Sequence, residues 1–518
     1  MPDPTVIILA FIAGMTLRKL GYPPLLGYLL TGFVASGFGL GDPKLIAPIA
    51  DIGITLLLFT IGLKLNLKEL IAPQVWAVAS LQMMAVIPLT ALVLILSAFF
   101  IPSLQFEQAS SAWVLAFALS FSSTVFAVKI FDERGETESL HASIAIGILI
   151  IQDLIAVVYL VLSSDKTPSL WAFALLALPL LRPVFSKLIV LAGHGELLVL
   201  LGICAALGGS ELFEWVNLKG GLGALVFGVL LGYSGKCNEL YKSLISFKDL
   251  FLIGFFIQVG YYGLPSLEML LIALFLSVLI FLRPIIYFGL LVIFKLRSRT
   301  ALLSSLSLFN YSEFGLIVAA LAATGGLLST DWVTTLALAM SFSFFIAVPF
   351  NARVHEYYPR ISAWLQKFER QERLAEEKAV ELGDADIVIL GMGRVGMGAY
   401  QYLKARFPRI VSIEEDYHKA LSHVGEGINC IHGDGSDGDF WVQAELDKRK
   451  LILISLTNHK ENVEVVKLLR QLEYAGKIAV VSRYPDEHKE LKGMGCVSFN
   501  LYKEAGHGFA EHVVEQLG

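Results

Sequence analysis

The chain has 518 residues, of which 56% are hydrophobic and 16% are charged, and its formal net charge is −5. This composition excludes a soluble globular protein, because the first roughly 350 residues contain one apolar segment after another, each near the ~20 residues that cross a bilayer. The slight negative net charge decides nothing, and no basic stripe indicates a nucleic-acid partner. We therefore predict a membrane protein that crosses the bilayer many times.

About thirteen membrane spans are predicted, all before residue 352. Their ranges are 5–20, 23–41, 46–63, 74–100, 110–131, 141–163, 168–190, 196–212, 218–234, 248–263, 266–294, 300–325 and 331–351. The start, MPDPTVIILAF, has no basic region before its apolar segment, so we expect a retained span and not a removed signal peptide. Lysine and arginine gather in the loops of one side, and the positive-inside rule then places the N-terminus outside and the C-terminal part in the cytoplasm.

The composition changes abruptly after Phe350 and divides the chain into three predicted parts. Residues 1–352 form the membrane domain, residues 353–383 a charged connector helix, and residues 384–518 a soluble domain. Strands alternate with helical segments in the soluble domain, which predicts a parallel, doubly wound, Rossmann-like α/β sheet. The predicted strands lie near 386–390, 410–414, 428–431, 451–455, 477–482 and 496–500.

Asp153 lies in the middle of an apolar segment, ILIIQDLIAVVYLVL, directly after Gln152. An aspartate at the centre of a bilayer costs roughly 2.5 to 3.5 kcal/mol on insertion scales, and such residues usually line an ion or proton path. Asp153 is therefore the first candidate for an ion site. The alternative is a hydrogen bond that packs two helices together.

Two apolar helices are interrupted by small or polar residues at corresponding places of the two halves. The segments are FALSFSSTVFAV at 117–128 and SLFNYSEFGLIVAA at 307–320. Paired interruptions of this kind indicate a transporter site built from broken helices, whose half-helix ends bring partial charges to mid-membrane. Ser122, Ser123 and Thr124 are then candidate ion-binding residues; the alternative is that these small side chains let helices pack closely.

The segment ADIVILGMGRVGMGAYQYL follows a predicted strand and opens a helix. Gly391, Gly393 and Gly396 have the G-x-G-x-x-G spacing, with Arg394 and Val395 between them, and Glu414 ends the next predicted strand. Glycines in this context let a pyrophosphate approach the helix N-terminus, and the acidic residue binds a ribose hydroxyl. We predict NAD(H) or an adenine nucleotide such as AMP or ATP; the alternative is a Rossmann fold with an unused site.

Seven motifs in chain order resemble the monovalent cation:proton antiporter-2 family, and within it the Kef-type potassium/proton antiporters with a C-terminal nucleotide-binding (RCK/KTN-like) regulatory domain. The motifs are GYPPLLGYLLTGFVASG (21–37), IADIGITLLLFTIGLKL (49–65), LSFSSTVFAVKIFDERGE (119–136), IGILIIQDLIAV (146–157), GLGALVFGVLLG (221–232), FKDLFLIGFFIQVG (247–260) and SEFGLIVA (312–319). The resemblance covers the membrane domain, and the Rossmann-like unit extends it almost to the C-terminus.

The resemblance implies an elevator-type antiporter of a bacterial inner membrane that forms homodimers through its membrane and cytoplasmic domains. Asp153 becomes the site for which a proton and potassium compete. Gln152 is the residue that potassium-linked members carry before the aspartate, and a single carboxylate favours electroneutral exchange. Arg283 lies where relatives carry a basic residue that pairs with the aspartate; the alternative is that Arg283 reaches toward the membrane surface.

Glu313 is a third charged candidate at the ion site, either at the positive end of a half-helix or beside the ion path. Asp434, in the segment HGDGSD, resembles the further acidic position of the regulatory domain. The loop KCNELYKSLIS is more basic than the corresponding loop of glutathione-gated members, so the resemblance does not extend to glutathione control.

Three other functions are alternatives. A sodium/proton antiporter of the same fold differs only in the transported cation. A nucleotide-gated potassium channel requires a filter like TVGYG, which the sequence does not contain. A membrane-anchored NAD oxidoreductase requires a substrate domain after the Rossmann unit. The sequence leaves no room for such a domain there, so we do not expect an enzyme.

Overall fold

The computed structural model describes residues 4–20, 22, 24–64, 70–101, 109–134, 136, 139–162, 169–218, 220–232, 236–261, 264–377 and 382–517. It consists of two compact units. The first, called the helical unit, comprises Met1–Ala127, Ile144–Phe294 and Ala301–Phe368. The second, called the sheet unit, comprises Val128–Ser143, Lys295–Thr300 and Glu369–Gly518. The units are therefore not continuous in sequence, unlike the predicted domains.

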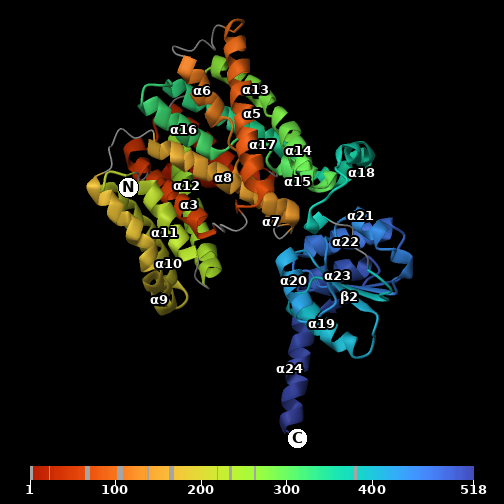
Figure 1. Cartoon of the computed structure of the whole chain (residues 1–518). Helices are drawn as coiled ribbons and strands as arrows, with labels where there is room; N and C mark the ends of the chain where they lie inside the picture. The colour runs from red at the N-terminus through yellow and green to blue at the C-terminus, as the bar shows by residue number, and fades with distance from the viewer. Residues whose placement is uncertain are drawn as a thin grey trace. The chain divides into compact units, whose positions relative to one another are not determined.

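Helices make up the described part of the chain as far as Phe368 (Figure 1). Their bounds are α1 (Pro4–Lys19), α2 (Leu25–Phe38), α3 (Pro43–Lys64), α5 (Pro73–Ala98), α6 (Ala109–Ala118), α7 (Thr124–Arg134), α8 (Leu140–Leu162), η2 (Leu170–Leu181), α9 (Arg182–Ala192), α10 (Glu196–Trp215), α11 (Gly220–Gly232), α12 (Cys237–Gly260), α13 (Leu267–Leu279), α14 (Leu282–Ile293), α15 (Ser298–Ser307), α16 (Glu313–Thr324), α17 (Thr330–Ala352), α18 (Val354–Leu365) and η3 (Gln366–Phe368).

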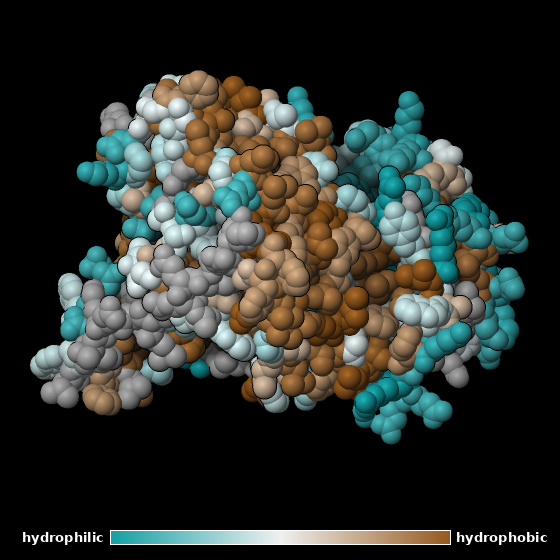
Figure 2. Space-filling model, turned by 90° about the horizontal axis from the view of Figure 1, so that it is seen from above, coloured by the Kyte–Doolittle hydropathy of each residue, from teal (hydrophilic) through white to brown (hydrophobic). Residues whose placement is uncertain are grey.

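Eight helical segments of the described residues are long and apolar enough to cross a membrane. Each of the thirteen predicted spans falls on helical residues, but the number thirteen is not established. The remaining predicted spans correspond to short helices, such as α2 and α11, or to broken ones, such as 110–131 and 300–325. Large apolar side chains including Phe11, Met84 and Ile285 are exposed, and Figure 2 shows a broad hydrophobic area, as a lipid-facing protein requires.

Both predicted interruptions are present. Residues 119–123 separate α6 from α7, and residues 308–312 separate α15 from α16. The breaks are bonded to each other, because the Ser123 backbone N–H donates to Asn310 Oδ1 at 2.6 Å and the Ser122 hydroxyl donates to the Leu308 carbonyl at 3.0 Å. A Cβ atom on Gly315 would lie 2.3 Å from the Ala118 carbonyl oxygen, so α16 crosses the end of α6 at backbone contact.

The sheet unit contains a six-stranded parallel sheet of order β3-β2-β1-β4-β5-β6. The strands are β1 (Ile387–Leu390), β2 (Ile410–Glu414), β3 (Cys430–His432), β4 (Leu451–Ile454), β5 (Lys477–Ser482) and β6 (Val497–Asn500). Residues of β1 alternate between two cores, with Val388 and Leu390 in one and Ile387 and Ile389 in the other. This alternation explains why the strand is apolar throughout, and all six predicted strands are confirmed.

Helices follow the strands in the sheet unit, and α24 extends from it as a separate rod (Figure 1). Their bounds are η4 (Ala375–Glu377), α19 (Arg394–Lys404), α20 (Tyr417–Gly425), α21 (Gly438–Gln443), η5 (Leu446–Lys448), α22 (His459–Gln471), α23 (Pro485–Gly493) and α24 (Leu501–Leu517). The alternation of strands and helices gives the predicted Rossmann-like topology.

The prediction of one connector helix over 353–383 is wrong. Helix α18 ends at Leu365, two short 3-10 turns follow at 366–368 and 375–377, and residues 378–381 lie outside the described part of the chain. Tertiary contacts explain the difference, because Glu369 Oε1 accepts from the backbone N–H and the hydroxyl of Ser298 at 2.8 and 2.7 Å. Such contacts override the helix propensity of the segment.

We expect Gly315→Ala to destabilise the protein, because the added methyl group collides with backbone and overpacking costs roughly 1–3 kcal/mol. Gly289→Ala, on α14, is the matched control, since a Cβ atom there meets no other atom within 4 Å. The measurement is the melting temperature of the full chain in detergent. Equal melting temperatures for the two variants would contradict the close crossing of α6 and α16.

Candidate functional site

Asp153 lies on α8 with 1% of its surface exposed. Its Oδ2 atom accepts a hydrogen bond from the Thr124 hydroxyl at 2.9 Å, and Thr124 is the first residue of α7. The carboxylate is therefore next to the positive N-terminal end of a half-helix. Its other oxygen, Oδ1, is buried and has no hydrogen-bond partner among the described residues. One oxygen of Asp153 is thus held in place and the other is available to a proton or a cation.

Gln152 joins α8 to the first helix break by hydrogen bonds. Its Oε1 atom accepts from the Ser122 backbone N–H at 3.0 Å, and its Nε2 atom donates to the Tyr287 hydroxyl at 2.8 Å and to Gln82 Oε1 at 3.0 Å. The amide is engaged on both sides by protein groups. Its geometry accordingly supports a role in orienting α8, beside the predicted role in binding the ion.

Glu313 is the first residue of α16 and is 2% exposed. Its charge interacts with that of Asp153, and the Ser123 side chain stabilises its carboxylate. The Ser312 hydroxyl lies 3.4 Å from Oε2, whereas Oε1 is buried and has no hydrogen-bond partner in the described structure. The structure therefore brings Glu313, Asp153, Ser123 and Thr124 to one place between the two breaks.

Lys248, on α12, was not among the predicted site residues. It is 7% exposed, and its charge acts on both Asp153 and Glu313. Its Nζ atom also lies 3.1 Å from Oδ1 of Asp249, which is exposed. Its position inside the motif FKDLFL could have pointed to the site. A lysine near the end of a predicted span is, however, interpreted equally well as a charge of the adjoining loop.

Arg283 contacts the helix breaks and not the aspartate. The buried guanidinium donates to the carbonyls of Ser120 at 2.6 Å and Phe121 at 3.0 Å, to the Ser122 hydroxyl at 2.7 Å, and to the Asn310 carbonyl. No ion pair joins it to Asp153 in the part of the chain that the structure describes. The reason is electrostatic, since these carbonyls follow α6 and α15 and carry the negative ends of both helix dipoles. A five-donor guanidinium fits such a set of acceptors.

The predicted glycine-rich loop lies between β1 and α19. Gly391 has a φ of 82°, which favours glycine, and a Cβ atom on Gly396 would lie 1.9 Å from the Gly391 carbonyl oxygen. Gly393 precedes the helix, and Arg394 and Val395 begin it, so the first backbone N–H groups of α19 are in the position that binds phosphate in Rossmann folds.

Glu414 ends β2, as predicted, and its carboxylate closes the glycine-rich loop. Its Oε2 atom accepts from the Met392 backbone N–H at 2.9 Å, and its Oε1 atom accepts from the Asp416 backbone N–H at 3.2 Å. A ribose hydroxyl that binds Glu414 therefore has to share the carboxylate with these backbone groups.

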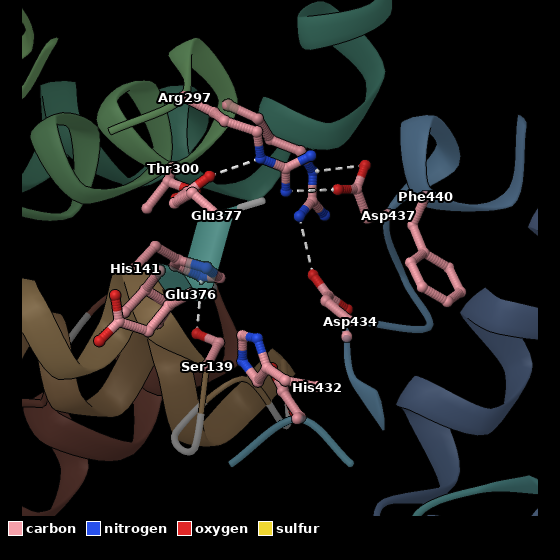
Figure 3. Close-up of a pocket in the computed structure, with 14 residues that line it drawn as sticks. Ser139, His141, Arg297, Thr300, Glu376, Glu377, His432, Asp434, Asp437 and Phe440 are labelled. Atoms are coloured by element: carbon pink, nitrogen blue, oxygen red, sulfur yellow. Dashed lines mark hydrogen bonds and ion pairs between the residues drawn. The ribbon is translucent and has the colours of Figure 1, made fainter. Parts of the chain in front are cut away.

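Asp434 lies in a pocket of the sheet unit, after β3 (Figure 3). The pocket is lined by Ser139, Leu140, His141, Arg297, Arg299, Thr300, Glu376, Glu377, Glu415, His432, Gly433, Asp434, Asp437 and Phe440. Asp434 Oδ2 accepts from Arg299 at 2.7 Å, and Oδ1 accepts from the backbone N–H and the hydroxyl of Ser436 at 2.8 and 2.6 Å. Burial alone raises the pKa of Asp434, but Arg299 and Ser436 outweigh it and lower the pKa to about 2. Asp434 is therefore ionised and fully engaged.

Arg297 forms a second set of ion pairs in the same pocket. It lies 2.5 Å from Glu377 Oε2 and 2.8 Å from Asp437 Oδ2 (Figure 3). Burial, followed by the charges of Asp434 and Glu136, raises the pKa of Glu461 to about 8. Two arginines thus hold an otherwise self-repelling acidic region together.

The described residues contain no group of three or more histidine, cysteine or acidic side chains that could hold a metal ion. The predicted potassium position at Asp153 relies instead on oxygen atoms, those of the Asp153 carboxylate and of the Thr124 hydroxyl that is bonded to it. Such a weak oxygen site suits an alkali cation that must bind and leave.

The sequence matches two family models. Residues 7–352 match the family described as "Sodium/hydrogen exchanger, transmembrane", and residues 387–499 match the TrkA-N domain. Among curated proteins, "Putative cation/proton antiporter YbaL" of Escherichia coli (strain K12) is 28% identical over 514 residues, which cover 93% of this chain and 91% of that protein. The relatives of this chain are therefore transporters.

Two solved structures are also similar. The sodium proton antiporter MjNhaP1 from Methanocaldococcus jannaschii is 14% identical, with a TM-score of 0.49, over 70% of this chain and 96% of that one. The TrkA-N domain of the inner membrane protein YbaL from Escherichia coli is 20% identical, with a TM-score of 0.22, over 24% of this chain and 93% of that one. Because the exchanger model matches more than half of the residues, the chain belongs to the sodium/hydrogen exchanger family, as a multi-pass cation/proton antiporter of the Kef type with a C-terminal TrkA-N domain.

Proposed function

We propose that the protein exchanges potassium for protons at Asp153 by elevator-type alternating access, electroneutrally and as a homodimer in a bacterial inner membrane, with its N-terminus outside. The observation that carries the proposal is the buried Oδ1 atom of Asp153, which has no hydrogen-bond partner among the described residues while Oδ2 is held by Thr124. A buried ionised carboxylate is costly unless a cation or a proton neutralises it.

Exchange follows from competition for this one carboxylate. A proton and an alkali cation each neutralise it, and both cannot bind at once. The empty, ionised site crosses the low-dielectric barrier poorly, so the site moves only when loaded. Each crossing therefore carries either a proton or a cation.

Potassium is favoured as the cation because Gln152 precedes the aspartate, as in the potassium-linked members that the sequence resembles. Sodium is the second candidate, which the description of the matched family favours. Proton flux measured in proteoliposomes with potassium and with sodium distinguishes the two cations.

Regulation by NAD(H), AMP or ATP is proposed for the TrkA-N domain. The glycine-rich loop supplies the phosphate site, and Asp434 supplies an acidic contact for the adenosine part. In the structure Asp434 is bound by Arg299, so a nucleotide that uses this carboxylate competes with the arginine. Arg299 lies in the first turn of α15, the half-helix that leads to the second break.

We expect Asp153→Asn to abolish cation-dependent proton flux, because the amide cannot exchange a proton for a cation. The assay is the dequenching of a pH-sensitive dye in proteoliposomes on addition of potassium, sodium, lithium or rubidium. Asp331→Asn, an exposed acid at the start of α17, is the control and keeps full activity. Undiminished exchange by Asp153→Asn would refute the proposed mechanism.

We expect Arg283→Lys to slow exchange by at least tenfold and to lower the melting temperature, although the charge is kept. A single ammonium cannot reach the three carbonyls and the hydroxyl that the guanidinium binds. If Arg283 acted only as a point charge, lysine would replace it with little loss. Exchange rate and melting temperature, measured on the same preparation, separate the two roles.

We expect Arg299→Ala to tighten nucleotide binding about tenfold, because the competitor for Asp434 is removed and a charged hydrogen bond is worth about 1.5 kcal/mol or more. Gly393→Asp places a negative charge at the phosphate site and is expected to abolish binding. Calorimetry on the full chain with NAD, NADH, AMP and ATP in turn measures both effects. Arg406→Ala, on the exposed side of the domain, is the control.

Two results would count against this account. Wild-type affinity of Arg299→Ala for every nucleotide would exclude competition at Asp434. Wild-type affinity of Gly393→Asp would exclude the glycine-rich loop as the phosphate site.

A further inference from the structure

We propose that helix α18, which follows the span α17, lies in the interface of the bilayer and binds anionic phospholipid. Its exposed apolar side chains enter the acyl region, and its basic side chains bind the phosphate groups. Under the proposed orientation the lipids belong to the inner leaflet. The binding does not depend on which cation the protein transports.

Helix α18 lies where two candidate spans end. It begins at Val354, two residues after the end of α17 at Ala352, and it belongs to the helical unit. The turn η3 that follows it ends at Phe368, whose ring lies 6.4 Å from that of Phe288 on α14 (Figure 1). Helix α14 completes another candidate span and leaves Ile285 70% exposed. The surface of α18 is therefore continuous with surfaces that face lipid.

One face of α18 holds the helix against the helical unit. Val354, Tyr358 and Leu365 are 1, 7 and 4% exposed. Their separations of four and seven residues place them on the same side of a helix. The helix is thus fixed by its own packing, and its other faces are available to a partner.

A second face, called the apolar stripe, is exposed. Its large side chains recur at i, i+4, i+7 and i+11 and are Tyr357, Ile361, Trp364 and Phe368. The Trp364 and Phe368 rings lie 5.0 Å apart and are still 60% and 52% exposed. A helix face that meets water is usually polar, whereas tryptophan and tyrosine concentrate at the membrane interface.

A third face, called the basic row, flanks the apolar stripe. Arg353, Arg360 and Lys367 are exposed and follow one another in steps of seven residues, about two helical turns. None of the three forms an ion pair with another residue that the structure describes. Glu356 is the one acidic residue in the sequence from 353 to 368. The basic row therefore carries an excess of positive charge along one edge of the apolar stripe.

An anionic phospholipid fits both faces at once. A helix with aromatic residues on one face and lysine or arginine beside it lies in the plane of the interface and prefers anionic lipids. A free anion such as phosphate binds only the basic row and leaves the apolar stripe in water. The continuity of α18 with two spans places it where phosphate groups and acyl chains meet.

The test measures the melting temperature of the full chain in an uncharged detergent as dioleoylphosphatidylglycerol is added, because a ligand of the folded state raises it. We expect the half-saturating lipid concentration to rise at least tenfold in Arg353→Gln/Arg360→Gln/Lys367→Gln, since each basic residue near an anionic surface contributes to binding. Arg353→Lys/Arg360→Lys keeps the charge and stays within about threefold of wild type.

A matched control removes three exposed lysines from the sheet unit, in the variant Lys489→Gln/Lys492→Gln/Lys503→Gln. We expect it to bind phosphatidylglycerol as the wild type does. The variant Ile361→Ser/Trp364→Ser tests the apolar stripe and is expected to need at least fivefold more lipid. Glycerol phosphate, the headgroup without acyl chains, is expected to leave the melting temperature of the wild type unchanged.

Four results would overturn the proposal. The first is wild-type lipid affinity of the triple variant of the basic row, and the second is an equal loss in the sheet-unit control, which would show an effect of net charge alone. The third is an equal response to glycerol phosphate, which would indicate a site for free anions. The fourth is a change of oligomeric state by light scattering in Ile361→Ser/Trp364→Ser with unchanged lipid affinity, which would make the apolar stripe a contact between copies of the chain.

Discussion

The hydrogen bonds of Arg283 to the two helix breaks are the interaction on which the rest of the membrane site depends. Each break leaves backbone carbonyls without helical partners at a depth where water is scarce, and every such group costs several kcal/mol if it stays unsatisfied. Arg283 satisfies the carbonyls of Ser120, Phe121 and Asn310 with one side chain. Because it comes from α14, it also fixes both breaks to a third helix.

This arrangement separates the charges of the site by helix polarity. The cationic guanidinium occupies the C-terminal ends of α6 and α15, and the carboxylates of Asp153 and Glu313 lie at the N-terminal ends of α7 and α16. Each fixed charge therefore meets a helix end of opposite sign. A helix that is interrupted once has one positive N-terminal end and one negative C-terminal end at its break. Two interrupted helices that are bonded to each other therefore have two positive ends, which stabilise two buried acids, Asp153 and Glu313, in an otherwise apolar protein.

The sequence allowed prediction of those features whose signal is local. The six strands were predictable from apolar runs with turn residues between them. Asp153 was predictable as a charge inside an apolar segment, and the helix breaks as clusters of small polar residues. The partners of Arg283 and the burial of Lys248 depend on how distant helices cross, which no local pattern records. The connector was predicted as one helix because its composition favours helix, but Glu369 binds Ser298 instead.

Helix α15 gives the proposed regulation a physical route. Its first turn carries Arg299, which binds Asp434, and the chain that leaves its last turn forms the second break, where Arg283 holds Asn310. A helix of ten residues is about 15 Å long and is stiff at that length. Arg299 and the residues that lead into the second break therefore belong to one continuous helix. The coupling requires only two arrangements of one arginine, bound to Asp434 or released from it, and a nucleotide that prefers the second.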